Sequence, residues 1–392
     1  KHFIPSQDPA EGLGVLMLFR LIEEALPAFF QPGRPIRIAR APGRLDVMGG
    51  AGARPRAFAV QLPTAEAACA AVQARHDDQV RLWSPCRDGS RTQMLSMRLG
   101  DLGLPDGPIG YDEARTLFAG DARDRWAGYL LGGLLVLARE HALTPAHGAD
   151  LLLHSDVPVG CGVGASTAVT IASLRAFALL YGVDLTPVEL ARLGEVVERE
   201  VLAADGRVAD AMTMVLGESG ELLVLRGAAG DLSDRLNVPM DLEFVGLETG
   251  TRAAVAVDEE ADADEDARVA RFRELLTQEP TAAHRRELGD LMFASHAASA
   301  ARGLGNATTD LVVDAAKRRR EVGGHVLGAR LTGRGGGGTV VLAGERGKVW
   351  YEALRVKKQL LEATGHSGHI FRWSSPGALS FGSIDLAPRA QP

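Results

Sequence analysis

The chain has 392 residues, 46% of them hydrophobic and 24% charged, so it is long and apolar enough for a sizeable core spread over two or three domains. Its net charge of −7 argues against nucleic acid as a partner, because a surface that follows phosphate groups needs a basic excess. Three scattered cysteines argue against a disulfide framework and a zinc cluster, and they fit a cytoplasmic location. The most apolar early stretch is cut by Arg20 and Glu24, which predicts a core helix and no membrane association.

The first half of the chain predicts alternating helices and strands, with no internal repeat and no long linker. In chain order these are a helix within residues 12–30, a strand at 35–44, two or three antiparallel strands within 57–84, a helix at 124–143, a strand at 148–158 and a helix at 165–181. A further helix has a marked start, because Thr186 is a suitable N-cap, Pro187 suits the first turn and Glu189 completes a capping box.

The second half also mixes strands and helices. Strands are expected at 220–227 and 242–250, and helices at 268–276 and 281–301. The acidic tract at 257–267 is typical of a solvated loop. We therefore expect a mixed α+β fold of two domains, residues 1–214 and 215–392.

A strand, a glycine-rich turn and a helix follow one another around "VPVGCGVGASTAV", residues 157–169. This arrangement is typical of an anion site, because glycines let backbone N–H groups approach the ligand and the helix N-terminus adds partial positive charge. No lysine follows Gly164, so the turn is not a Walker-type loop. Taken alone, the turn could equally be a tight structural connection.

Two further elements favour the anion site. Four consecutive glycines, 335–338, lie between two short apolar strands, and glycines in such a place suggest a close approach of the backbone to another group. In "RIARAPGRLDVMGG", Arg44 lies at the end of an expected strand among small residues.

These three elements, in this order and spacing, resemble the motifs of the GHMP family of small-molecule kinases. "PVGCGVGASTA" is similar to the phosphate loop of that family, roughly PxGxGLxSSAA, and "LTGRGGGGTVVL" to its third motif, roughly KxTGGGxGGxxxxL. "APGRLDVMGG" resembles the galactokinase opening, APGRVNLIGEH, and especially the opening of the plant L-arabinokinase kinase domain. Further likenesses at 125–137, 288–310 and 369–382 extend the resemblance to about residues 35–386.

The resemblance implies an N-terminal domain like the second domain of ribosomal protein S5, a ferredoxin-like C-terminal domain, and a site for ATP and Mg²⁺ between them. The residues that match the ATP phosphate loop are Pro158, Gly160, Gly162, Val163, Gly164, Ala165, Ser166 and Thr167. Of these, Ser166 matches the serine linked to Mg²⁺. The third motif would pack against the loop through Thr332, Gly333, Gly335, Gly336 and Gly337, although Arg334 stands where a glycine is expected.

Two residues match the catalytic pair of galactokinases. Arg44 matches the arginine that stabilises charge on the reacting oxygens, and its alternative role is a surface ion pair. Asp210 matches the aspartate that accepts the sugar hydroxyl proton, and Asp205 is a nearby alternative. The surroundings of Asp210 differ from the family's GxxxGxMDQ segment, because "MDQ" is replaced by "ADA" and the preceding Cys-Gly pair by Gly206-Arg207.

The expected sugar pocket departs from the family pattern. By the resemblance, Asp46, Gly50 and Arg54 contact the substrate, but Ala53 and Arg54 replace an Asp-Tyr pair, and Ala253 stands where relatives have a histidine. Removing groups that bind sugar hydroxyls should change what the pocket accepts. Either the pocket is re-tuned, with Arg54 or Arg56 pairing with a carboxylate or phosphate of the substrate, or phosphorylation is weakened or lost.

We therefore expect a kinase that uses ATP and Mg²⁺ to phosphorylate the anomeric hydroxyl of a monosaccharide, of the L-arabinose or galactose type or a sugar acid. The alternative is a catalytically weak regulator that binds nucleotide or sugar. A non-sugar GHMP substrate such as homoserine or mevalonate is disfavoured by the galactokinase-like flanks. Monomer and dimer both stay open.

Overall fold

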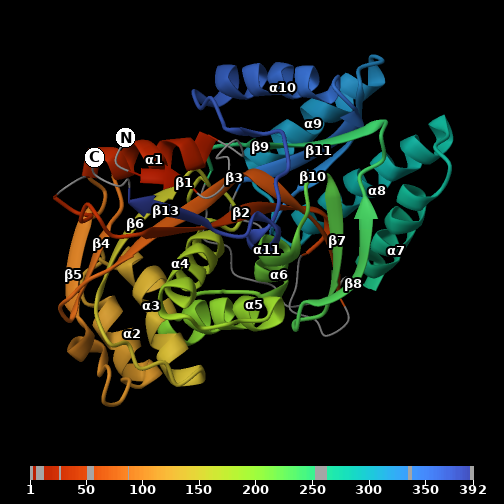
Figure 1. The fold of residues 1–392 in the computed structure, drawn as a ribbon. Helices are drawn as coiled ribbons and strands as arrows, with labels where there is room; N and C mark the ends of the chain where they lie inside the picture. Colours follow the sequence, from red (N-terminus) through yellow and green to blue (C-terminus); the bar gives the residue numbers. More distant parts are fainter. Residues whose placement is uncertain are drawn as a thin grey trace.

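The computed structural model describes residues 3–5, 13–25, 28–50, 57–86, 88–251, 263–333 and 338–388. Within these ranges the chain forms two β-sheets with helices packed against both (Figure 1). The mixed α+β architecture expected from the sequence is confirmed. No helix in the described ranges is both long enough and apolar enough to cross a lipid bilayer.

The larger sheet joins strands from distant parts of the chain. Its main path runs β1-β13-β2-β3-β6-β4-β5, β7 also pairs with β3, and β8 pairs with β7. The strands are β1 (Phe3–Pro5), β2 (Ile36–Gly49), β3 (Phe58–Ala74), β4 (Gln79–Trp83), β5 (Met94–Arg98), β6 (Ala149–Ser155), β7 (Glu221–Arg226), β8 (Asp231–Asn237) and β13 (Ile384–Pro388). All neighbours pair antiparallel except β4 and β6, which are parallel.

Strand β3 is longer than the sequence indicated. Instead of two or three strands within 57–84, residues 58–74 form one strand of 17 residues, followed by β4. A proline usually interrupts a strand, because it has no N–H to donate. Pro63 lies opposite Arg44 at a register shift of β2, where the loss of one N–H disturbs the hydrogen-bond ladder least. The irregular pairing therefore lies where β2 carries Arg44, which the sequence placed at the end of a strand.

Helices cover both faces of the larger sheet. The set on one face comprises α3 (Trp126–Glu140), α4 (Ala165–Tyr181), α5 (Pro187–Val196) and α6 (Val208–Leu216), and α1 (Leu13–Ala25) covers the other face (Figure 1). β3 shows the alternation of a strand between two layers, because Ala70 and Val72 pack toward α4 while Cys69 and Ala71 pack toward α1. The capping box at the start of α5 forms as predicted, with Thr186 accepting from the Glu189 N–H.

The smaller sheet has the order β10-β11-β9-β12 and lies beside the larger one. Its strands are β9 (Leu242–Glu248), β10 (Val326–Leu331), β11 (Thr339–Glu345) and β12 (Ile370–Phe371). The remaining helical segments are α2 (Tyr111–Ala119), α7 (Ala263–Thr277), α8 (Ala282–Ala301), α9 (Ala307–Glu321), α10 (Val349–Thr364), α11 (Ala378–Phe381), a 3₁₀ turn η1 (Leu99–Leu102) and a π-helical turn η2 (Val197–Val201). α9 and α10 share a buried core with this sheet.

The division of the chain at residue 214 stays a prediction. β7 and β8, which follow that point, pair within the larger sheet, and so does β13 near the end of the described chain. The acidic tract expected as a loop at 257–267 is described only from Ala263, where α7 begins.

Candidate active site

The glycine-rich turn connects β6 to α4 at the edge of the larger sheet's helical layer. Gly160, Gly162 and Gly164 have φ values of 76°, 76° and 79°, a left-handed conformation that side chains other than glycine rarely adopt. Gly164 is the N-cap of α4, so the N–H groups of Ala165, Ser166 and Thr167 begin the helix without an intrahelical acceptor. Unpaired N–H groups at a helix start are what an anion site requires, and the anion-binding role of the turn stays a prediction.

Arg44 joins this turn to helix α6. Its backbone N–H donates to Val163 O at 2.9 Å, and its Nη1 donates to Gly162 O at 2.5 Å. On the other side its Nε and Nη2 donate to the two Asp210 carboxylate oxygens at 2.9 and 2.7 Å. Arg44 is 4% exposed and Asp210 6%, so this is a buried bidentate ion pair and not a surface one.

The ion pair fixes the charge state of both partners. Burial opposes the charge on Arg44, but the neighbouring Asp210 and Asp46 carboxylates raise the pKa of its guanidinium above the ordinary value. Burial would likewise raise the pKa of Asp210, yet Arg207 and Arg44 hold that pKa well below its usual range. Asp210 is therefore ionised and a weak base. Such a carboxylate orients a hydroxyl group readily, but it accepts the proton of that hydroxyl only late in a reaction.

Asp46 connects the pair to the third motif. Its backbone N–H donates to Thr332 Oγ1 at 2.6 Å, and its Oδ2 accepts from the Gly333 N–H at 3.0 Å. Gln61 Nε2 lies between the two carboxylates, 2.6 Å from Asp46 Oδ1 and 2.8 Å from Asp210 Oδ1. The side chain that the sequence assigned to substrate is thus fully buried and occupied by protein contacts.

The third motif also touches the phosphate loop directly. A Cβ on Gly333 would come 2.7 Å from Gly162 O, and Thr339 Oγ1 donates to Cys161 O at 2.6 Å. Gly333 has a φ of 73°, so a side chain there would be strained as well as blocked. Close packing of the two glycine segments thus depends on the absence of a side chain at residue 333.

A carboxylate that the sequence did not single out lies behind the loop. Glu198, in the π-helical turn η2, accepts from Thr167 Oγ1 at 2.8 Å and also contacts the Ser166 hydroxyl. Burial raises the pKa of Glu198 to about 7, although both hydroxyls act to lower it. Glu198 is thus a buried carboxyl held by the two hydroxyls that follow the glycine-rich turn.

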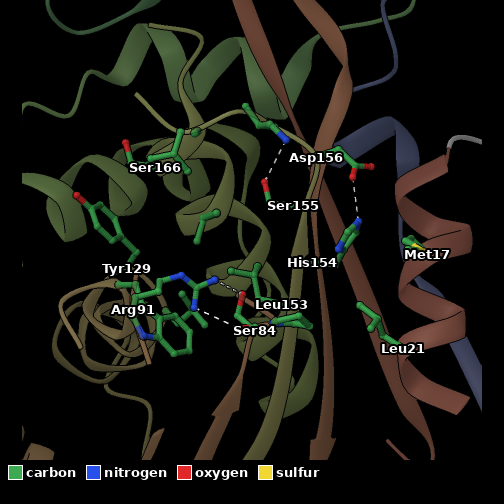
Figure 2. Close-up of a pocket in the computed structure, with 17 residues that line it drawn as sticks. Met17, Leu21, Ser84, Arg91, Tyr129, Leu153, His154, Ser155, Asp156 and Ser166 are labelled. Carbon is green, nitrogen blue, oxygen red and sulfur yellow. Dashed lines mark hydrogen bonds and ion pairs between the residues drawn. The ribbon is translucent and has the colours of Figure 1, made fainter. Parts of the chain in front are cut away.

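Next to the loop lies a cavity of about 620 Å³, within the range of roughly 300–1,000 Å³ usual for ligand pockets. Figure 2 shows Ser166 and Tyr129 at one side and His154 and Asp156 at the other. Trp126 and Tyr129 both line it. Aromatic side chains beside a phosphate cradle suit the flat base of a nucleotide.

Part of the chain matches a known sequence family: residues 129–218 match the description "GHMP kinases N terminal domain". Over this segment the chain is similar to the GHMP kinase family. Members of this family are ATP-dependent phosphotransferases that act on alcohol groups. The matched range contains the glycine-rich turn, Glu198 and Asp210, so the likeness covers part of the segment that builds this site.

The chain is also similar to curated sugar kinases. The chain is 26% identical over 506 residues to L-arabinokinase of Arabidopsis thaliana, covering 93% of this chain and 48% of that protein. It is 30% identical over 230 residues to galactokinase of Chloroflexus aurantiacus, covering 57% of this chain and 52% of that protein. The chain thus spans about half the length of these curated relatives.

Solved structures confirm the GHMP kinase fold. Lactococcus lactis galactokinase in complex with galactose superposes with a TM-score of 0.70 at 18% identity, over 94% of this chain and 99% of the galactokinase. Mevalonate kinase of Methanococcus jannaschii superposes with a TM-score of 0.62 at 19% identity, over 86% and 98% of the two chains.

Some residues that the GHMP motifs predicted lie outside the described residues. These are Ala53, Arg54, Ala253, Arg334, Gly335, Gly336 and Gly337. Glu198 was missed, and one signal could have found it: it lies four residues after Gly194 and three before Val201, on the buried face of its helix. An acid on an otherwise apolar stripe is worth a functional explanation.

Filling the cavity is expected to weaken nucleotide binding. Val169, on α4, lines the cavity, and Val169→Phe would place a ring in it. We expect the KM for ATP to rise by about tenfold, equivalent to roughly 1.4 kcal/mol of binding free energy, with little change in the KM for the acceptor. Val188→Phe is the matched control, because Val188 is 41% exposed on α5; an equal rise in both variants would contradict the assignment.

Proposed function

We propose that this chain transfers the γ-phosphoryl group of ATP to the anomeric hydroxyl of a monosaccharide. The observation that carries the proposal is the buried Arg44–Asp210 pair, in which Arg44 also binds the carbonyls of Gly162 and Val163 in the glycine turn. One side chain thus links a candidate acceptor-binding carboxylate to a candidate phosphate cradle. The likeness to L-arabinokinase and to galactose-bound galactokinase supports a sugar as the acceptor.

In the proposed reaction the N–H groups at the start of α4 hold the ATP phosphates, and the base occupies the cavity beside Tyr129. Arg44 stabilises negative charge on the transferring group. The acceptor oxygen forms a bond to the γ-phosphorus as the bond to the β-phosphate oxygen breaks. Asp210 orients the acceptor hydroxyl and takes its proton late in the transfer, in keeping with its low pKa.

Ser166 and Glu198 fit a magnesium site. Mg²⁺ prefers oxygen ligands and is usually held by one or two carboxylates together with substrate phosphates. Glu198 is buried in contact with the Ser166 and Thr167 hydroxyls. No group of three or more acidic, histidine or cysteine side chains suited to a metal occurs among the described residues, so substrate phosphates would have to supply further ligands. Bound Mg²⁺ would neutralise charge on the phosphates.

A second candidate, a regulator that binds ligand and turns over slowly, is favoured by one observation. Arg207 contacts the same Asp210 oxygens as Arg44, so the candidate base is occupied. In the family motif a glycine stands at the position of Arg207, and a glycine has no side chain that could contact the aspartate.

The deciding experiment measures ADP release from MgATP with L-arabinose, D-galactose, D-galacturonate and D-glucuronate, and identifies the product by ³¹P NMR. We expect sugar-dependent ADP release and an anomeric phosphate. ATP binding without ADP release on any sugar would favour the regulator. ADP release that does not depend on the acceptor would show hydrolysis alone.

A further inference from the structure

A second arginine, Arg207, lies against the candidate catalytic carboxylate. Arg207 is the N-cap residue of α6, three positions before Asp210. Its Nη2 lies 2.9 Å from Asp210 Oδ1 and 3.1 Å from Oδ2, and its Nε lies 3.3 Å from Oδ2. The same Nη2 is 3.6 Å from Asp46 Oδ2. Arg207 therefore forms the second positive partner of a cluster with two carboxylates.

With Arg207 in this position, Asp210 has no acceptor site left for a substrate hydroxyl. Its oxygens already receive N–H groups from Arg44 Nε and Nη2, from Gln61 Nε2, and from Arg207 Nε and Nη2. An ionised carboxylate offers about four lone-pair positions. One of these partners must withdraw before Asp210 can bind an acceptor.

Arg207 is the partner best placed to withdraw. Arg44 is held within β2 and bound to two carbonyls of the phosphate loop, and Gln61 is fully buried and accepts from Thr213. The Arg207 side chain is 13% exposed and lines a second cavity of about 220 Å³. The other charged residues on its wall are Asp205 and the ion pair Glu195–Arg199. Arg207 Nη1 donates to the Gly50 carbonyl, at the end of β2. A ligand in that cavity would meet the Arg207 guanidinium.

The charges around Arg207 determine which kind of ligand can displace its guanidinium from Asp210. Arg44 and Arg207 together match the charges of Asp46 and Asp210, all within a buried cluster. A neutral ligand that displaced Arg207 would leave that guanidinium unpaired in a largely buried place, which is strongly unfavourable. An anionic ligand would supply a new bidentate partner while Arg44 still pairs with Asp210.

We propose that Arg207 is a specificity-determining residue that selects acceptor sugars carrying a carboxylate or a phosphate. The anionic group takes over the Arg207 guanidinium, and this exchange frees Asp210 for the acceptor hydroxyl. The inference rests on the proposed sugar kinase function and names its substrate class. Sugar acids and sugar phosphates share the required chemistry, and the experiment separates them.

The test compares kcat/KM for neutral sugars (L-arabinose, D-galactose), sugar acids (D-galacturonate, D-glucuronate) and sugar phosphates (D-galactose 6-phosphate, D-glucose 6-phosphate). We expect the wild-type protein to prefer one anionic group over its neutral counterpart by about 10- to 100-fold, the range for a hydrogen bond to a charged group. Arg207→Gly should abolish that preference, lowering kcat/KM for the anionic sugar and leaving or raising it for the neutral one. Arg207→Lys, which keeps the charge without the planar fork, should retain part of it.

Arg192→Gly is the matched control, because Arg192 is an exposed arginine on α5. A purely structural role for Arg207 would lower kcat/KM equally for neutral and anionic sugars, and that result would overturn the inference. A wild-type preference for neutral sugars would also overturn it.

A binding measurement separates this inference from the proposed function. Calorimetry with the same sugars and without turnover should show tight binding of the anionic sugar to the wild-type protein and loss of that binding in Arg207→Gly. If no sugar is phosphorylated but this pattern holds, the kinase proposal fails and the role of Arg207 stands. If sugars are phosphorylated and binding does not depend on Arg207, the inference fails and the kinase proposal stands.

Discussion

Replacing Asp210 with asparagine is expected to lower the kcat for sugar phosphorylation by about 10²- to 10⁴-fold, because the amide keeps the shape of the side chain but cannot take the acceptor proton. Arg44 would lose the carboxylate that now lies 2.7 Å from its Nη2. Removing one partner of a buried ion pair costs about 3–5 kcal/mol of folding stability, so thermal unfolding must be measured beside the kinetics.

Nucleotide binding separates catalysis from folding in this variant. The cavity beside Tyr129 and the loop glycines do not include Asp210, so Asp210→Asn should bind ATP with an affinity close to that of the wild-type protein. Asp184→Asn is the matched control, because Asp184 is exposed before α5. Near-normal kcat in Asp210→Asn, with Asp184→Asn also normal, would remove Asp210 from the proposed mechanism.

Replacing Glu198 with glutamine is expected to raise the Mg²⁺ concentration needed for half-maximal rate by about 10- to 100-fold, the range seen when a group that supports a metal site is lost. Glutamine preserves the volume and can still accept from Thr167 Oγ1, so the packing around η2 should persist. The measurement is the initial rate against Mg²⁺ concentration at saturating ATP.

Glu200→Gln is the control for this variant. Glu200 lies in the same π-helical turn but is exposed, so it should leave the Mg²⁺ dependence unchanged. An unchanged Mg²⁺ dependence in Glu198→Gln would assign Glu198 a structural role in holding Thr167. Loss of rate that added Mg²⁺ does not restore would also contradict a metal role.

The sequence predicted correctly those segments whose structure depends on residues nearby in the chain, such as helix caps and turns. The capping box at Thr186 and the end of α4 at Gly182 formed as expected, because caps depend on residues within one turn. The strand, glycine turn and helix around residues 157–169 followed for the same reason. Arg44 and Asp210 lie in contact, although they are far apart in sequence, and their roles stay a prediction.

Features that depend on distant pairing could not be predicted from these patterns. The length of β3 is set by three partners, β2, β6 and β7, and not by its own alternation. The apolar stripe on which Glu198 lies could have marked it as buried, but its contacts with Ser166 and Thr167 depend on the fold of η2. Arg207 was noticed only as a departure from a motif, and its contact with Asp210 depends on the fold of α6.

The pairing of β2 with β13 has a consequence for synthesis on the ribosome. Residues 384–386 pair with Ile38, Arg37 and Ile36, more than three hundred positions earlier in the chain. Until this late segment emerges, that edge of the strand bearing Arg44 keeps unpaired backbone groups, which are prone to join strands of other nascent chains. The candidate catalytic strand is therefore among the last to gain all its neighbours.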